Sequence, residues 1–149
     1  MKIIKNFFTD EECFDMILTY RKKVVPAAVG KNSFDFSTRI SRVYIWKNDL
    51  ELEKKFNRKK MLFQFTQYTK NQFYNWHSDF KTDGNFNRIE SFTVLLNDEF
   101  AGGEFEIKNV GIIKLLKGDC VSFNSKLDHR VNVLKSGIRY SLVGWVCDS

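Results

Sequence analysis

The chain has 149 residues, 43% of them hydrophobic and 15% aromatic, which is enough to bury the core of one domain. A single proline and eight glycines exclude a collagen-like or low-complexity chain, and no apolar run approaches the roughly 20 residues that cross a bilayer. The formal net charge of +6 permits an acidic partner, including nucleic acid, although the basic residues are scattered along the chain.

The cysteines and the amino terminus bear on the cellular compartment. The chain has three cysteines, Cys13, Cys120 and Cys147. Their odd number and wide spacing argue against a disulfide scaffold or a zinc knuckle. The first residues lack the apolar stretch and cleavage site of a secretion signal. We therefore expect a cytoplasmic protein with reduced thiols and no membrane attachment.

The chain begins with a predicted short strand over residues 2–8, and a helix start follows it. Thr9 can cap the free N–H groups of this helix, and Glu12 occupies the reciprocal position of a capping box. Apolar residues then recur at helical spacing. Pro26 and Gly30 are expected to close this unit.

From residue 39 onward the apolar pattern has mostly a period of two, with a short helix expected at 49–56. Turn signals at 117–119 and 135–137 separate several strands. We expect a single-domain, mainly β (α+β) fold, a sandwich or jelly roll, in which residues 1–60 support a core formed by residues 61–149. The predicted strands lie at 39–46, 61–68, 73–76, 92–96, 104–107, 110–116, 120–123, 129–134 and 138–146.

The chain contains only two histidines, and both have settings that suit a metal ion. In an extended segment the side chains of His77 and Asp79 project to the same side, so they can hold one ion together. His129 lies in a later predicted strand. Two histidines and one carboxylate form the facial triad of non-haem Fe(II) enzymes, although a zinc hydrolase can use the same ligands.

Arg139 narrows the choice between these metals. It follows His129 across the 135–137 turn, so we expect the two strands to be hairpin neighbours. In the last strand, Arg139 shares one face with Ser141 and Trp145. A guanidinium and a hydroxyl in an apolar wall suit the distant carboxylate of a dicarboxylic cosubstrate, whereas a buried arginine without an anion is costly.

From about residue 65 onward the chain resembles the 2-oxoglutarate/Fe(II) dioxygenases of the prolyl-hydroxylase branch. The resemblance rests on several pieces in the family's order and spacing, and it covers more than half of the chain. The pieces are residues 68–79, Arg88, Leu95-Leu96-Asn97, Gly102-Gly103-Glu104-Phe105, residues 118–123, His129-Arg130-Val131, residues 137–141 and Trp145.

The resemblance implies a double-stranded β-helix, or jelly roll, with N-terminal helices packed on one sheet. It implies that His77, Asp79 and His129 bind iron. It also implies that Arg139 pairs with the far carboxylate of 2-oxoglutarate, with help from Tyr68 and Ser141. The family's cofactors are Fe(II), the cosubstrates 2-oxoglutarate and O2, and ascorbate as a further requirement of some members.

The resemblance departs from the family at Leu95, where some prolyl hydroxylases carry a tyrosine that contacts the cosubstrate. Leu95 cannot form that hydrogen bond, so Ser141 or Tyr68 has to compensate.

Four further residues are candidates for the pocket or for substrate contact: Trp145, Tyr74, Trp76 and Arg88. Ordinary core packing is the alternative for the aromatic residues. The polar segment 81–87 is either a mobile lid or a plain surface loop.

The expected activity is hydroxylation of a substrate C–H, with decarboxylation of 2-oxoglutarate to succinate and CO2. The branch points to a prolyl or other protein side chain, and therefore to a peptide or protein partner. Oxidative demethylation of nucleic acid and hydroxylation of a small molecule are alternatives in the same superfamily. A non-catalytic binding module on the same fold is the alternative from a different class.

Overall fold

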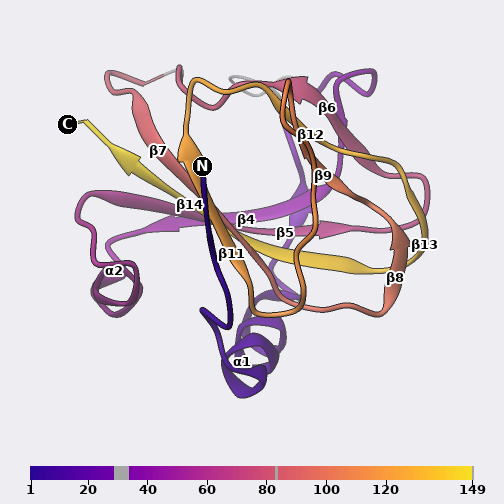
Figure 1. Ribbon diagram of the computed structural model, residues 1–149, viewed down its shortest axis with the longest axis horizontal. Helices are drawn as coiled ribbons and strands as arrows, with labels where there is room; N and C mark the ends of the chain where they lie inside the picture. Colours follow the sequence, from indigo (N-terminus) through magenta and orange to yellow (C-terminus); the bar gives the residue numbers. More distant parts are fainter. Residues whose placement is uncertain (29–33, 83, 149) are drawn as a thin grey trace.

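The computed structural model describes residues 1–28, 34–82 and 84–148, which form antiparallel sheets with helices outside them (Figure 1). The segments in chain order are β1 (Lys2–Ile4), α1 (Asp10–Tyr20), β2 (Val25–Pro26), β3 (Arg39–Ile40), β4 (Arg42–Lys47), α2 (Leu50–Phe56), β5 (Met61–Tyr68), β6 (Phe73–His77), β7 (Arg88–Leu95), β8 (Phe100–Gly102), β9 (Phe105–Ile107), β10 (Gly111–Ile113), β11 (Cys120–Asn124), β12 (His129–Val131), β13 (Leu134–Gly137) and β14 (Arg139–Cys147).

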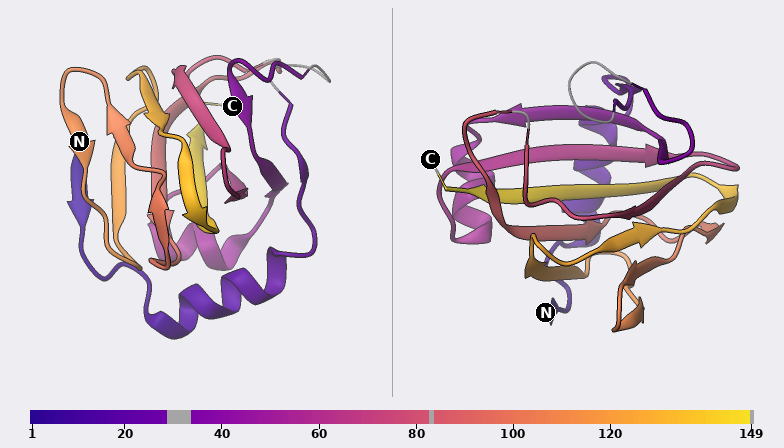
Figure 2. Two further views of the ribbon diagram at one scale, coloured as in Figure 1. Left: turned by 90° about the vertical axis from the view of Figure 1, so that its right-hand side faces the viewer. Right: turned by 90° about the horizontal axis from the view of Figure 1, so that it is seen from above.

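The described strands form two larger sheets and one strand pair. The seven-stranded sheet has the order β1-β11-β7-β14-β5-β4-β2, and the five-stranded sheet has the order β10-β9-β12-β6-β3. The remaining pair is β13-β8. Consecutive strands often lie in different sheets, as the views in Figure 2 allow the reader to follow, and this is the connectivity of a jelly roll.

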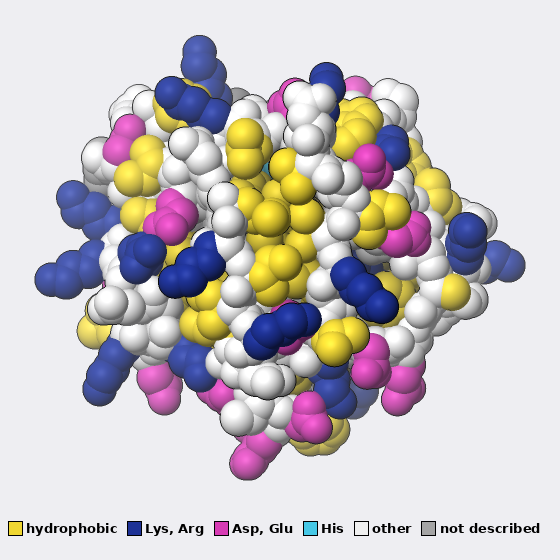
Figure 3. Space-filling model, in the orientation of Figure 1, with side chains coloured by type: hydrophobic (Ala, Val, Ile, Leu, Met, Phe, Trp, Pro, Cys, Tyr) yellow, Lys and Arg dark blue, Asp and Glu magenta, His cyan; other side chains and the backbone are white. Residues whose placement is uncertain are grey.

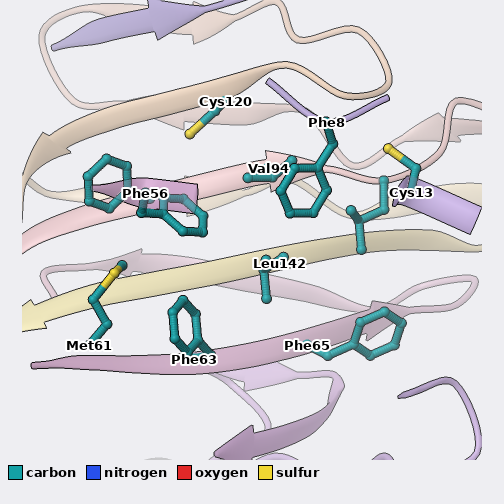
Figure 4. Packing of buried hydrophobic residues seen from close by; sticks show 11 residues of the cluster. Phe8, Cys13, Phe56, Met61, Phe63, Phe65, Val94, Cys120 and Leu142 are labelled. Atoms are coloured by element: carbon teal, nitrogen blue, oxygen red, sulfur yellow. The ribbon is translucent and has the colours of Figure 1, made fainter. Parts of the chain in front are cut away.

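The helices cover the outer face of the seven-stranded sheet, which is where the main apolar cluster lies. Strand β5 shows how the sequence divides the two faces. Phe63 and Phe65 are fully buried and pack beneath the helices with Cys13 of α1 and Phe56 of α2 (Figure 4). The alternate residues face the other sheet. Each buried phenylalanine contributes about 2–3 kcal/mol, so this cluster fixes the large sheet as a platform.

The helix start predicted at Thr9 is confirmed. The Thr9 hydroxyl accepts a hydrogen bond from the Glu12 amide at 3.1 Å, and the Thr9 amide donates to the Glu12 carboxylate at 2.9 Å. The strand before it is shorter than predicted, because Asn6 adopts a positive φ of 53° and turns the chain after Ile4. The helix predicted over 49–56 is present as α2, and Asp49 caps it.

The strand predicted over 39–46 proves to be two strands in different sheets. β3 pairs with β6 of the five-stranded sheet, whereas β4 pairs with β5 of the seven-stranded sheet. The break falls at Ser41, so the short segment passes from one layer to the other. A pattern of alternating residues does not reveal such a transfer, because the alternation continues on both sides of the break.

The hairpin predicted between His129 and Arg139 is wrong. β12 lies between β9 and β6 in the five-stranded sheet, and β14 lies between β7 and β5 in the other. Residues 135–137 do not form a free turn, because they belong to β13 and pair with the unpredicted strand β8. Leu134 is fully buried and anchors this crossing. His129 and Arg139 therefore come from opposite layers.

The boundary expected at Gly30 lies outside the described residues. None of the described helices is both long and apolar enough to span a membrane.

Candidate metal centre and its cavity

The three residues expected to bind a metal ion lie together. His77 ends β6 and His129 begins β12, and the register of these strands places the two residues opposite each other. The His77 Nε2 lies 3.6 Å from Asp79 Oδ1, and the His129 Nε2 lies 3.4 Å from Asp79 Oδ2. The three ligand atoms are all within 4.8 Å of one another, a spacing that one metal ion can bridge.

A bulge in β6 brings a second residue to the same side as His77. The pairing with β12 shifts between His129 and Val131. The three residue intervals from Tyr74 to His77 in β6 therefore lie opposite only two intervals in β12. Tyr74 and His77 consequently both line the cavity, and their rings stack with centroids 3.4 Å apart. Strict alternation would have turned these two side chains to opposite sides.

Both imidazoles are oriented by backbone carbonyls. The Nδ1 of His77 donates to the carbonyl of Asn75 at 2.7 Å, and the Nδ1 of His129 donates to the carbonyl of Leu127 at 3.0 Å. A carbonyl can only accept, so each Nδ1 carries the proton and each Nε2 presents a lone pair toward Asp79. This is the tautomer that a metal-binding histidine requires.

Asp79 lies just beyond the end of β6 and is held by a network that sequence reasoning missed. Its amide donates to the carbonyl of Ser125 at 2.9 Å. Its Oδ2 accepts hydrogen bonds from Ser91 Oγ at 2.8 Å and from Trp145 Nε1 at 3.0 Å. Ser91 in turn lies 2.8 Å from Ser125, oxygen to oxygen. These contacts orient the carboxylate and leave Oδ1 free of protein donors among the described residues.

The electrostatics suit a cation shared by these groups. Burial alone would raise the pKa of Asp79, but His129, His77 and Trp145 together outweigh burial and hold that pKa well below its usual range. Burial opposes the charged form of His129, yet the Asp79 carboxylate raises its pKa. Burial, followed by repulsion from His129, lowers the pKa of His77 to about 3. The site therefore presents an anionic carboxylate on Asp79 and a neutral imidazole on His77 near neutral pH.

Arg139 lies on the opposite layer and is 2% exposed. Its Nε has no hydrogen-bond partner, and no carboxylate of the described residues forms an ion pair with it. Burial lowers its pKa, and its guanidinium carbon lies 5.8 Å from the centre of the Tyr68 ring. An unpaired buried guanidinium is costly, so this position fits an anionic ligand.

The candidate partners of Arg139 line the same wall. Tyr68 is opposite Arg139 in the register of β5 and β14, and Ser141 lies two residues further along β14. Both side chains are nearly fully buried. Leu95 is opposite Ser141 and lines a separate cavity of about 160 Å³ beside Arg139, where it presents no donor.

One cavity of about 420 Å³ joins the metal ligands to Arg139. Its walls come from both layers, which is why residues distant in sequence meet there. The predicted candidates Tyr74, Arg88, Ser141 and Trp145 all line it. Trp76 is not among the lining residues, and the Arg130 guanidinium lies over its ring at 4.4 Å.

The cavity also contains residues that the sequence alone did not single out, above all Arg39 from β3. Of the polar segment 81–87, Lys81 and Thr82 line the cavity, and Asp83 lies outside the described residues.

Comparison with known proteins decides the family. Residues 63–147 match the family model of the 2OG-Fe(II) oxygenase superfamily, which is more than half of the chain and includes all of these site residues except Arg39. The chain belongs to the 2OG-Fe(II) oxygenase superfamily. The resemblance expected from the sequence is thus confirmed.

Curated relatives of this chain carry the name PKHD-type hydroxylase. One from Acaryochloris marina is 33% identical over 87 residues, which are 55% of this chain and 40% of that protein. Another, from Synechococcus sp., is 37% identical over 79 residues, which are 49% of this chain and 36% of that protein. The chain thus spans about two fifths of the length of the curated relatives it matches.

Solved structures confirm the jelly roll expected for this chain. A prolyl-4-hydroxylase from Pseudomonas putida superposes with a TM-score of 0.81 at 17% identity, covering 99% of this chain and 92% of that one. A viral collagen prolyl hydroxylase from Paramecium Bursaria Chlorella virus-1 gives a TM-score of 0.75 at 22% identity, covering 99% and 96%. At these identities the likeness concerns the fold.

The superfamily implies Fe(II) and 2-oxoglutarate, and the residues present in this chain fit both. Two oriented imidazoles and one carboxylate are a suitable donor set for Fe(II). The orphaned, buried guanidinium of Arg139 suits a carboxylate at the other end of the cavity.

Proposed function

We propose that this chain is an Fe(II)- and 2-oxoglutarate-dependent hydroxylase. The observation that carries this proposal is the shared cavity, with His77, Asp79 and His129 at one place and the unpaired Arg139 at another. When bound, Fe(II) and 2-oxoglutarate supply the oxidation of a substrate C–H by O2, with release of succinate and CO2.

The protein's own residues would position these groups. The Nε2 atoms of His77 and His129 and the Oδ1 of Asp79 would ligate the ion. Arg139 would pair with the far carboxylate of the cosubstrate, and the Tyr68 and Ser141 hydroxyls beside it would donate hydrogen bonds to it. The apolar remainder of the wall would exclude bulk water from the reacting atoms.

We further propose a single domain in which residues 1–60 support the catalytic core at 61–149. The packing of α1 and α2 against the outer face of β5, β7 and β14 supports this division. These helices stiffen the sheet that carries Arg139 without reaching the cavity.

A peptide or protein is the substrate class that we favour. One solved neighbour, with a TM-score of 0.76 at 16% identity, is a prolyl hydroxylase from Trichoplax adhaerens in complex with a hypoxia inducible factor peptide fragment. The molecular surface gives less support to nucleic acid. On the face in Figure 3, Lys and Arg side chains are interspersed with acidic and uncharged ones instead of forming a continuous band.

A turnover assay without any added substrate tests the proposed reaction. The protein would be incubated with Fe(II), 2-oxoglutarate, ascorbate and O2, and succinate would be measured. We expect slow uncoupled succinate formation that His129→Ala abolishes and that the surface variant Arg58→Gln retains. Protein that holds Fe(II) yet neither binds 2-oxoglutarate nor forms succinate would be a non-catalytic module on the same fold.

A further inference from the structure

The cavity contains more positive charge than the proposed cosubstrate needs. Besides Arg139, the side chains of Arg39 and Arg88 line it. Arg39 is 7% exposed, and its Nη2 has no hydrogen-bond partner. The Nε of Arg88 is also buried without a partner. No carboxylate among the described residues forms an ion pair with either side chain.

Both guanidinium groups are held next to the metal ligands by aromatic rings. Arg39 lies 4.4 Å from the centre of the Tyr74 ring, and that ring stacks on His77. Arg88 lies 3.8 Å from the centre of the Trp145 ring, whose indole N–H donates to Asp79. Each arginine is thus separated from a metal ligand by a single aromatic ring.

Arg39 is fixed in this position from a second direction. Its Nε donates to the Ser41 hydroxyl at 2.9 Å, which fixes the guanidinium in the wall of the cavity. The Ser41 hydroxyl is itself buried. The guanidinium of Arg39 is rigid and uses only part of its hydrogen-bonding capacity. It is therefore preorganised to bind an anion, because its side chain would lose little conformational entropy on binding.

A count of formal charges shows what remains unbalanced. Asp79 is the sole acidic residue among the described residues that line the cavity. Together with the two carboxylates of 2-oxoglutarate it balances Fe(II) and Arg139. Arg39, Arg88 and Lys81 then remain without counter-charge. Lys81 is exposed and screened by water, whereas Arg39 is buried and Arg88 is half-buried. Two such cations are costly to desolvate unless the remaining ligand brings an anion.

We propose that Arg39 and Arg88 bind a carboxylate of the substrate, close to the carbon that is hydroxylated. The substrate is then an acid, either a free amino acid or a peptide with a carboxylate beside the target residue. A carboxylate matches the fork of a guanidinium, and a small acid suits a cavity of about 420 Å³ that also has to hold the cosubstrate. This inference rests on the proposed function and narrows its substrate class.

The test compares each acid with its own amide, on protein loaded with Mn(II) and N-oxalylglycine in place of Fe(II) and 2-oxoglutarate. The probes are free amino acids, N-acetyl amino acids and short peptides, each with a carboxylate or a carboxamide at the same position. Binding near the ion is measured by the Mn(II)-enhanced relaxation of the probe's protons. We expect at least one acid to bind saturably and its amide to bind at least about tenfold more weakly.

Variants then assign the effect to the two arginines. Arg39→Gln and Arg88→Gln should each weaken binding of the acid roughly tenfold and bring it near that of the amide. The matched variant Arg58→Gln, which changes an arginine paired with Glu90 on the surface, should leave both affinities unchanged. If free amino acids bind and peptides do not, the carboxylate comes from a small molecule, and the reverse result identifies a peptide.

The outcomes separate the two proposals. If the unmodified protein does not take up Mn(II) and N-oxalylglycine, the proposed function and this inference both fail. If it is loaded but binds acid and amide equally, or binds no acid, the inference alone is overturned. Binding of nucleoside monophosphates in preference to every carboxylate would likewise overturn it, in favour of a phosphate-bearing substrate.

Discussion

The Asp79 carboxylate accepts two hydrogen bonds on its Oδ2, from Ser91 and Trp145, and these bonds fix its Oδ1 beside the imidazole of His77. Outer contacts of this kind govern how well a ligand binds its metal. Ser91 comes from β7 and Trp145 from β14, so the large sheet controls a site whose histidines belong to the small one.

Removal of the Ser91 hydroxyl should therefore weaken metal binding without unfolding the protein. We expect Ser91→Ala to reduce Mn(II) affinity roughly tenfold, since changes to such supporting contacts typically cost 10–100-fold. Electron paramagnetic resonance of free Mn(II) measures this directly. Ser122→Ala, on the neighbouring strand β11, is the matched control and should bind normally. Equal affinities in the two variants would contradict a role for Ser91 in orienting Asp79.

Arg139 should act on the cosubstrate and not on the ion. Arg139→Gln keeps much of the side chain's volume but removes its charge. We expect N-oxalylglycine to bind roughly 10–100-fold more weakly to the Mn(II)-loaded variant, because a charge-assisted pair is lost, while Mn(II) affinity stays the same. Isothermal titration calorimetry separates the two affinities. A loss of Mn(II) binding equal to the loss of N-oxalylglycine would argue for a structural role instead.

At the scale of single elements, the sequence predicted helices and strands best where the structure of a segment depends on its own residues. The capping box of Thr9 and Glu12 and the alternation of β5 are local signals, and both are present as expected. The predictions failed where the structure of a segment depends on the strand with which it pairs. Nothing near residue 135 in the sequence indicates that β13 pairs with β8 or that the chain there changes sheets.

The carboxylate of Asp119 links the segment that follows β1 to the turn that precedes β11. Its contribution to the stability of the fold should depend on pH. Its carboxylate accepts hydrogen bonds from Lys5, from the Asn6 amide and from the Leu116 amide. Burial opposes the charged form, but these donors outweigh it and lower the pKa of Asp119 below its ordinary value of 3.8. The stabilisation is therefore fully present above that value and is lost as the pH falls through the lower, folded-state pKa.

The Asp119→Asn variant tests this dependence. We expect its free energy of unfolding to be about 1–3 kcal/mol lower near pH 7, because buried donors lose a charged acceptor. The difference from the unmodified protein should shrink as the pH is lowered toward 2. Urea titrations at several pH values measure it, with the exposed variant Asp98→Asn as control. A difference that does not change with pH would contradict the assignment.

For the whole molecule, the candidate site is a product of the jelly roll's two layers. The sequence indicated His77, Asp79, His129 and Arg139 because metal chemistry restricts residue types so strongly. It did not indicate Arg39, Ser91 or Ser125, since serine and arginine occur in many settings. Only the fold brings these three to the cavity or its ligands, from β3, from β7 and from the segment after β11.

Ligands that bridge the two layers should stabilise the whole fold. N-oxalylglycine at about 100 times its dissociation constant from the Mn(II)-loaded protein should add about 2.7 kcal/mol to the stability of that protein, which corresponds to a rise in Tm of roughly 5–10 °C for a chain of this size. Differential scanning calorimetry measures the shift. His129→Ala should show little of it. An equal shift in that variant would mean that the ligands bind elsewhere.

The bulge in β6 has a consequence for protein engineering. A regular ladder between β6 and β12 that kept every residue of β6 would leave Tyr74 and His77 three positions apart on an unbroken strand. It would send one of these two rings to the outer surface, because residues three positions apart on a regular strand take opposite sides. The bulge should therefore be kept in any redesigned sequence. A variant in which β6 is a regular strand is expected to bind a metal ion less well.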